Sequence, residues 1–158
     1  MEIDSDIIIV GGGLNGSLLA IAAAKIGFST IVLDSKGNHR DKLNSFDGRS
    51  YALAASSVRL LKNLDIFEDI RGCSQPILDI EILDGKLVQG PSQFSLHFDN
   101  NEIHNGPMGY MVEDRFIQKT LFAQILATNQ IDYKFDSKVT EHYPVSYTHL
   151  TLPTKQDV

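Results

Sequence analysis

A glycine-rich turn between two apolar segments constrains the fold of this chain more than any other feature. Residues 7–10 are β-branched without alternation, which predicts a strand covered on both faces, as in a parallel sheet. Residues 11–13, all glycine, interrupt this strand. Residues 14–26 are rich in Leu, Ala and Ile, and they predict a helix that ends at Gly27. Residues 30–33 predict a second buried strand, so the chain should open with the βαβ unit of a Rossmann-like α/β fold.

The pattern Gly11-x-Gly13-x-x-Gly16 matches the dinucleotide-binding fingerprint, and the predicted strand and helix around it supply the context that this fingerprint requires. Gly11 permits a tight turn, Gly13 lets the backbone approach a pyrophosphate, and Gly16 lets the helix pack closely on the strand. The first helical amides, at Leu14 and Asn15, would then point at the phosphates.

Asp34 follows the second strand, about 20 residues after the glycines, where such folds place the acid that binds the adenosine ribose. A carboxylate there also repels a 2′-phosphate, so we expect FAD or NAD rather than NADP. The alternative interpretation is a glycine turn without a ligand and a solvated Asp34.

The organisation after Asp34 favours FAD over NAD, because regular βα units do not continue. Beyond a polar loop at residues 35–46, the patterns predict helices at 54–64, 65–70 and 113–128, half-exposed strands at 77–83 and 94–98, a turn at Gly106, and strands at 131–135 and 138–143. Such an interruption by period-two strands is typical of large FAD-binding architectures. We therefore predict a parallel sheet followed by the beginning of an antiparallel substrate sheet.

Two further segments carry a resemblance to a known family. Residues 47–53, Asp-Gly-Arg-Ser-Tyr-Ala-Leu, resemble the second marker of the ubiquinone-biosynthesis hydroxylases, which belong to the single-component flavin aromatic hydroxylases typified by para-hydroxybenzoate hydroxylase. Residues 106–115, Gly-Pro-Met-Gly-Tyr-Met-Val-Glu-Asp-Arg, look like a further marker, and the resemblance covers roughly residues 6–135. It implies FAD as cofactor, with Arg49 along the phosphate–ribitol portion and Asp114 where relatives carry a polar residue that contacts FAD.

The expected cofactor-binding residues are therefore Gly11, Gly13, Leu14, Asn15, Gly16, Asp34, Arg49 and Asp114. Each charged member has another interpretation. Arg49 could form an ion pair with Asp47 or a nearby acid, and Glu113 or Asp114 could cap the following helix. Arg115 could pair with Glu113.

The resemblance implies hydroxylation of the aromatic ring of a polyprenylated phenol, with NAD(P)H as reductant and O₂ as oxidant. Because the flavin carries this chemistry, we assign no catalytic acid or base. A prenylated substrate implies contact with a membrane surface or a biosynthetic complex. The rival hypotheses are a stand-alone FAD- or NAD-binding module without turnover and another flavin oxidoreductase on the same fold.

Composition excludes several other classes. With 14 basic and 20 acidic residues the formal charge is −6, and no basic cluster is present to bind nucleic acid. The single cysteine forms no internal disulfide, and the five histidines are scattered without metal-ligand spacing, so we expect no metal. No secretory signal or membrane-spanning apolar stretch is recognisable. We expect a cytoplasmic protein that at most contacts the inner membrane peripherally.

The end of the chain differs in character from the rest. We expect residues 1–144 to be the N-terminal part of an FAD-binding monooxygenase domain, because the Asp-Gly and Gly-Asp markers that relatives carry further on are missing. Residues 145–154 resemble one reading frame of a transposase adapter used in sequencing libraries. We therefore expect residues 145–158 to be a poorly packed tail. Residues 1–158 alone should be inactive and, through exposed strand edges, prone to aggregate.

Overall fold

The structure is a computed structural model that describes residues 4–37, 45–86, 90–103 and 106–143. The proposed tail at 145–158 lies outside the described residues. The helices are α1 (Leu14–Lys25), α2 (Ala55–Asn63), α3 (Phe67–Arg71), α4 (Asp114–Ala127) and the 3₁₀ helix η2 (Asn100–Ile103). The strands are β1 (Ile7–Val10), β2 (Thr30–Leu33), β3 (Ser50–Ala54), β4 (Ser74–Ile77), β5 (Asp79–Lys86), β6 (Gly90–Asp99), β7 (Gly109–Glu113) and β8 (Ile131–Lys134).

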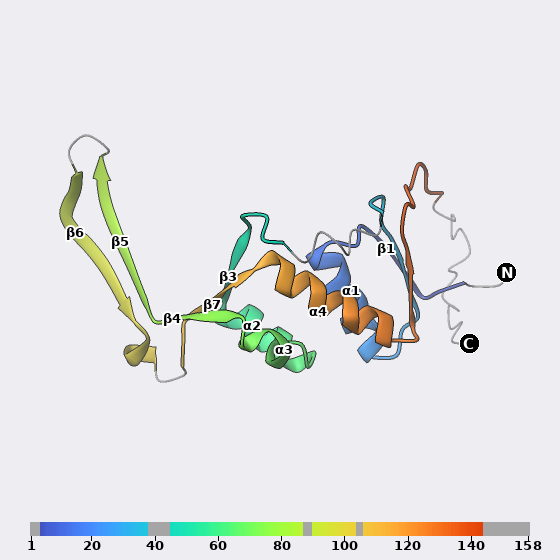
Figure 1. Ribbon diagram of the computed structural model, residues 1–158, viewed down its shortest axis with the longest axis horizontal. Coiled ribbons are helices and arrows are strands. Elements are labelled where there is room, and N and C mark those ends of the chain that lie inside the picture. The colour runs from blue at the N-terminus through green and yellow to red at the C-terminus, as the bar shows by residue number, and fades with distance from the viewer. Residues whose placement is uncertain (1–3, 38–44, 87–89, 104–105, 144–158) are drawn as a thin grey trace, which may run out of the picture.

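A parallel sheet in the order β1-β2-β8 confirms the predicted βαβ opening (Figure 1). Helix α1 connects β1 to β2 and ends where the sequence predicts. Gly27 adopts φ 99° and donates its amide hydrogen to Ala24 at 3.0 Å, while Phe28 donates to Ala23 at 3.1 Å. This pair of hydrogen bonds is the Schellman arrangement, which favours glycine at the left-handed position.

Only one face of the parallel sheet is well covered by the described residues, so the prediction of a strand buried on both faces is wrong. Ile9 and Val32 pack into the core, but Ile8 and Val10 on the opposite face are 63% and 67% exposed. Because side chains alternate across a strand, one covering layer of helices buries only every second residue.

One hydrophobic core runs from this sheet through α1 and α4 to α2 and α3. The apolar positions predicted on the second helix, Val58, Leu61 and Leu64, are all buried, as is Phe67 at the start of α3. Leu121 of α4 is 1% exposed. The core therefore fixes α4 relative to the parallel sheet.

The structure also contains an antiparallel sheet in the order β3-β7-β4, which the sequence did not predict. In β3 and β7, Ser50 pairs with Glu113, and the amide of Asp114 donates to the carbonyl oxygen of Arg49 at 3.0 Å. Pro76 occupies edge strand β4, where a missing amide hydrogen is tolerated. This sheet brings residues 47–50 against the first turn of α4.

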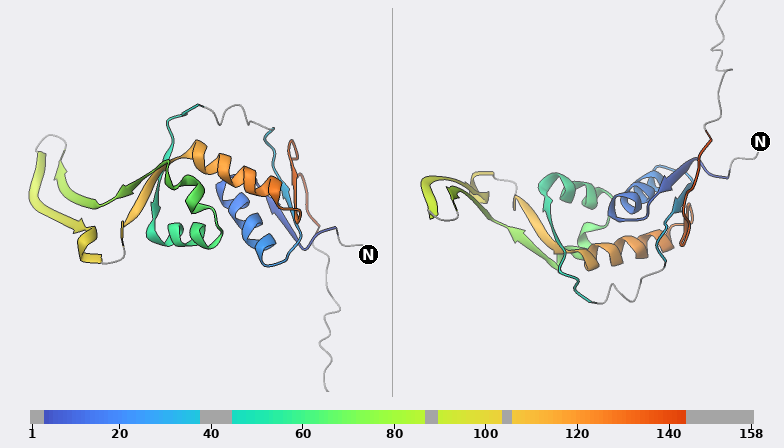
Figure 2. Two further views of the ribbon diagram at one scale, coloured as in Figure 1. Left: turned by 60° about the horizontal axis from the view of Figure 1, so that its bottom comes forward. Right: turned by 90° about the horizontal axis from the view of Figure 1, so that it is seen from above.

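Strands β5 and β6, which largely coincide with the strands predicted at 77–83 and 94–98, pair with each other as an antiparallel hairpin. The hairpin extends away from the helices α1 to α4 in every view (Figures 1 and 2). The prediction that its strands are half-exposed is wrong, since both faces of β5 and β6 are exposed where side chains are described, including Ile82, Leu83 and Phe94.

The strand predicted at residues 138–143 is also wrong, because these described residues have no strand partner. Asp136, at φ 51°, turns the chain directly after β8, and Ser137 donates its amide hydrogen to the carbonyl oxygen of Asp34. The predicted α/β class, a parallel sheet followed by antiparallel sheets, is nevertheless confirmed. In the described part of the chain, no helix combines the length and apolarity needed to cross a membrane.

Candidate functional site

The glycine turn after β1 has the geometry that the fingerprint requires. Gly11 adopts φ 105° and donates its amide hydrogen to Leu33 at 2.8 Å. A Cβ on Gly16 would lie 1.9 Å from the carbonyl oxygen of Gly11, which confirms that this glycine permits close packing of helix and strand. A Cβ on Gly13 would meet nothing within 4 Å. The backbone at Gly13 is thus open to an approaching group.

Helix α1 begins without a side-chain cap. Gly13 is the N-cap residue, it has no side chain to accept a hydrogen bond, and the first turn contains no acid. The amides of Leu14, Asn15 and Gly16 therefore belong to the first-turn donors that lack an intrahelical acceptor. An anion above this turn would be stabilised by those donors and by the helix dipole.

A cavity of about 430 Å³ lies over this turn. It is lined by Gly11, Gly12, Gly13, Leu14, Ser17, Asp34, Ser35, Lys36, Gly37, Arg49, Tyr51, Gln118, Leu121, Phe122, Tyr133 and Phe135. Five of the eight residues expected to bind a cofactor are in this lining. The other three, Asn15, Gly16 and Asp114, are outside the lining. Of these, Gly16 packs against Gly11, and Asp114 pairs with Arg49.

Asp34 presents a half-buried carboxylate at the cavity wall. Its Oδ1 accepts a hydrogen bond from the amide of Lys36 at 2.9 Å, and its Oδ2 accepts one from the hydroxyl of Tyr133 at 2.8 Å. Burial, followed by the neighbouring Asp34 carboxylate, raises the pKa of Tyr133 well above its usual value. The Tyr133 hydroxyl therefore stays protonated and remains a donor at neutral pH.

Gly12 is the variable position of the fingerprint, yet its lack of a side chain has a structural reason. A Cβ there would lie 1.8 Å from the Tyr133 hydroxyl oxygen and 2.8 Å from Oδ2 of Asp34. The buried Ser17 donates its hydroxyl to the Gly12 carbonyl oxygen at 3.0 Å. The sequence did not predict roles for Gly12, Ser17 and Tyr133. Tyr133 lies 121 positions from Gly12, so no local pattern indicates their contact.

Three aromatic rings form a further part of the cavity wall. Tyr133 and Phe135 have ring centroids 4.6 Å apart, and Phe122 of α4 lies 6.0 Å from Tyr133 and 5.7 Å from Phe135. Tyr133 lies in β8, Phe135 directly follows this strand, and Phe122 comes from α4, so this wall combines two elements of the fold.

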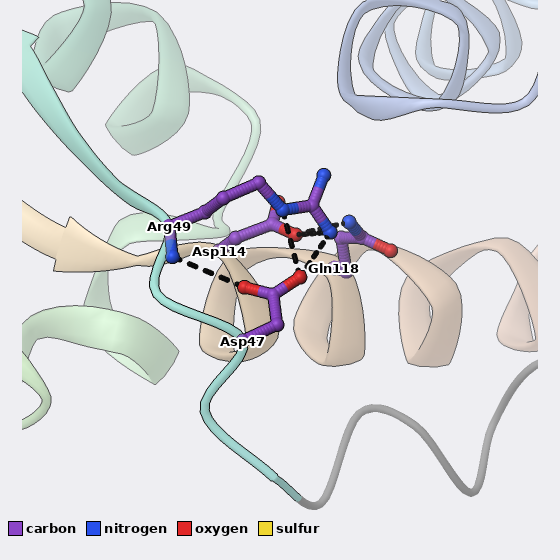
Figure 3. A network of polar contacts seen from close by, with 4 residues as sticks. All are labelled: Asp47, Arg49, Asp114 and Gln118. Carbon is purple, nitrogen blue, oxygen red and sulfur yellow. Dashed lines mark hydrogen bonds and ion pairs between the residues drawn. The ribbon is translucent and has the colours of Figure 1, made fainter.

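Arg49, which lines the cavity, joins the carboxylates of Asp47 and Asp114 (Figure 3). One terminal guanidinium nitrogen lies 2.5 Å from Oδ2 of Asp47 and 2.7 Å from Oδ2 of Asp114. Gln118, one turn along α4, donates to the same Asp114 oxygen at 2.6 Å. The ion-pair interpretation of Arg49 is thus realised in this structure, and Figure 3 shows its other terminal nitrogen pointing away from both carboxylates.

These contacts shift the pKa values of Asp47 and Arg49, the two exposed members of the network. The hydrogen bond from Arg49 holds the pKa of Asp47 below its usual value, and the same bond with the charge of Asp114 raises the pKa of Arg49. The Asp114 side chain is 3% exposed, and its Oδ1 is buried without a hydrogen-bond partner among the described residues.

The structure contradicts side-chain capping of α4 by Glu113, one of the two acids at the start of this helix. Glu113 is the N-cap residue and makes no side-chain capping bond. Its carboxylate instead accepts a hydrogen bond from Nε of Arg115 at 2.6 Å, as the alternative for Arg115 predicted. The Asp114 carboxylate instead forms an ion pair with Arg49, the residue before β3, and accepts a hydrogen bond from Gln118.

Comparisons with known proteins agree with this geometry. No family model matches the chain. The chain is 39% identical over 121 residues to ubiquinone hydroxylase UbiL of Rhodospirillum rubrum, covering 77% of this chain and 27% of that protein. It is 30% identical over 125 residues to 3-demethoxyubiquinol 3-hydroxylase of Escherichia coli, covering 78% of this chain and 30% of that protein. The chain thus spans less than a third of the length of these relatives.

Solved structures define the class of fold. The p-nitrophenol 4-monooxygenase PnpA of Pseudomonas putida matches 89% of this chain and 34% of its own, with a TM-score of 0.67 at 20% identity. The flavin-dependent monooxygenase PieE matches 85% of this chain and 24% of its own, with a TM-score of 0.63 at 15% identity. The fold is that of the flavin-dependent monooxygenases. Among curated proteins, the chain is similar to ubiquinone hydroxylases and to a 3-demethoxyubiquinol 3-hydroxylase.

Proposed function

We propose that this chain binds FAD in the cavity over the glycine turn, as part of a monooxygenase that hydroxylates the aromatic ring of a polyprenylated phenol in ubiquinone biosynthesis. The observation that carries the proposal is the convergence on one cavity of an uncapped helix N-terminus, the carboxylate of Asp34 and the guanidinium of Arg49. The names of the similar ubiquinone hydroxylases support the reaction and the substrate class.

The residues present fit the chemistry of FAD. A pyrophosphate needs donors and positive potential, and the amides of Leu14, Asn15 and Gly16 supply both at the start of α1. The open space beside Gly13 allows the phosphates to approach the backbone. An adenosine ribose needs acceptors, which Asp34 supplies.

Arg49 and Asp114 would serve the portion of the cofactor beyond the phosphates. The Arg49 guanidinium adds charged donors at the cavity wall, and the buried Asp114 carboxylate, held by Gln118, fixes its direction. When bound, FAD supplies the transfer of one oxygen atom from O₂ to the ring after reduction by NAD(P)H. The chain's own residues bind and orient the cofactor.

This assignment places residues 1–144 in the FAD-binding domain and leaves residues 145–158 outside it. A substrate with a long prenyl tail would be met at a membrane surface or within a biosynthetic complex. Residue roles, reductant and partners are all part of the proposal.

The test is to purify the intact protein and identify its cofactor by absorbance near 450 nm and by mass after release, a wavelength that is a property of the flavin. We expect FAD, and oxidation of NADH or NADPH that increases when a polyprenylated phenol is added, with one oxygen atom gained by the product. Asp34→Ala should weaken FAD binding, whereas Asp132→Ala, which removes an exposed carboxylate from β8, should not. Retention of NAD instead of FAD, or no bound nucleotide, would contradict the proposal.

A further inference from the structure

The carboxylate of Asp34 is held from two directions by groups of this chain. The amide of Lys36 binds Oδ1 and the Tyr133 hydroxyl binds Oδ2, at 2.9 and 2.8 Å. Such a carboxylate has about four acceptor positions, two on each oxygen. One position on each oxygen is therefore used, and one on each remains for a ligand.

The two remaining positions match the two vicinal hydroxyls of a ribose. Asp34 lines the cavity beside the glycine turn, so a ribose there would meet both oxygens from the open side. Its hydroxyls would donate to acceptors that are already fixed in direction. A carboxylate free to rotate would first have to lose that freedom.

We propose that Tyr133 is a positioning residue that orients Asp34 toward the ribose diol of the bound nucleotide. The inference rests on the proposed FAD site and extends it to a residue outside the dinucleotide fingerprint. Tyr133 does not need to touch the nucleotide for this role, because it acts through Oδ2 of Asp34.

The surroundings of Tyr133 direct its hydroxyl proton to Asp34. The hydroxyl oxygen also lies 3.1 Å from the Gly12 carbonyl oxygen, a longer contact to an uncharged acceptor. A hydroxyl has one proton, and the shorter contact to a charged acceptor is the stronger hydrogen bond.

The ring of Tyr133 is restrained as well as its hydroxyl. Phe122 and Phe135 pack against the ring, and the missing side chain of Gly12 provides the space that the hydroxyl occupies. Gly12 and Tyr133 thus form a complementary pair, which explains why the turn carries a third glycine.

The test compares two competitors of FAD on the intact apoprotein, ADP with its ribose diol and 2′,3′-dideoxy-ADP without it. Tyr133→Phe keeps the ring and removes only the hydroxyl. We expect it to weaken ADP binding about fivefold, the effect of losing one hydrogen bond, and to leave dideoxy-ADP binding unchanged. The matched control is Tyr110→Phe, which removes a hydroxyl from β7 outside the cavity lining and should change neither affinity.

If Tyr133 had only a structural role, Tyr133→Phe would weaken the binding of both competitors equally. That result would overturn the inference, and so would unchanged affinity for both. In an Asp34→Asn background the effect of Tyr133→Phe on ADP should shrink, because the two residues act as one unit. If Tyr133→Phe does not fold, Gly12→Ala, which displaces the ring, should give the same selective loss of ADP affinity. Wild-type protein that binds neither FAD nor ADP would refute the FAD site itself, whereas wild-type binding without the selective loss would refute only the role of Tyr133.

Discussion

The parallel sheet and the β5–β6 hairpin are both built from strands that the sequence predicts, yet they differ in burial. Val32 of β2 is fully buried, whereas Phe94 and Leu96 of β6 are 82% and 61% exposed. The parallel sheet has α1 and α4 packed on one face, whereas the hairpin extends away from these helices (Figure 2). Strand formation therefore follows from local pattern, but burial depends on what packs against the strand. The cavity over the glycine turn is found in the region where helices provide that packing.

The largest effect on stability is expected where the backbone of α1 contacts the backbone of the glycine turn, at Gly16 and Gly11. Gly16→Val places a side chain 1.9 Å from the Gly11 carbonyl oxygen, so it should lower the free energy of unfolding by about 3 kcal/mol or more. Urea denaturation of both proteins measures this.

The matched control for that change is Gly13→Ala, whose Cβ enters open space at a φ of −69°. It should change stability by less than about 0.5 kcal/mol while weakening FAD binding, because the added methyl occupies the approach to the turn. If Gly16→Val were as stable as wild type, the close contact of helix and strand would not exist in solution.

A second pair of substitutions compares the two regions directly. Leu121→Ala removes a side chain that is 1% exposed and should cost about 3 kcal/mol. Leu96→Ala in the hairpin should cost less than about 0.5 kcal/mol in the 158-residue chain. Equal costs in urea denaturation would show that the hairpin is covered and would remove the contrast between the regions.

A third comparison concerns the charged groups of each region. Arg49→Ala leaves the buried Asp114 carboxylate without its cation and should weaken FAD binding about tenfold, since a charge-assisted hydrogen bond is lost. His97→Ala removes an exposed pair with Asp79 in the hairpin and should leave FAD affinity unchanged. Flavin fluorescence titration of the apoprotein measures both. Equal affinities in the two variants would exclude Arg49 from the cofactor site.

The sequence predicted those parts of the site that lie close together along the chain. The turn at Gly11, the packing role of Gly16 and the cap at Gly27 are local, and all three are confirmed. Asp34 was placed by its spacing, and it does line the cavity.

The β3–β7 pairing and the contact between Tyr133 and Asp34, which the sequence did not predict, both join residues that are distant along the chain. Strands β3 and β7 carry short, weakly alternating sequences, and their pairing aligns Arg49 with Asp114. Tyr133 reaches Asp34 across 99 positions because β8 joins the sheet beside β2. The apolar pattern of the hairpin predicted a buried face, because a pattern cannot state whether a second layer covers it.

The smallest expected effect is a difference in acid sensitivity between the two regions. Hydrogen bonds from the Ser29 hydroxyl and amide to Asp6 hold its pKa below the ordinary value of 3.8. Bonds from the Asn101 amide and side chain lower the pKa of Asp99 in the same way. Each carboxylate therefore contributes stability that is complete above its unfolded pKa and is lost as the pH falls through its lower folded pKa.

The consequence should differ because Asp6 connects β1 to the segment before β2, whereas Asp99 lies at the end of the exposed hairpin. Asp6→Asn should reduce the pH dependence of the free energy of unfolding below about pH 4, measured by urea denaturation. Asp99→Asn should leave that global dependence unchanged, since the hairpin can open locally without exposing the core, and should alter only the amide exchange of β5 and β6. If Asp99→Asn changed the global free energy as much as Asp6→Asn, the hairpin would unfold together with the parallel sheet, and the two regions would form a single cooperative unit.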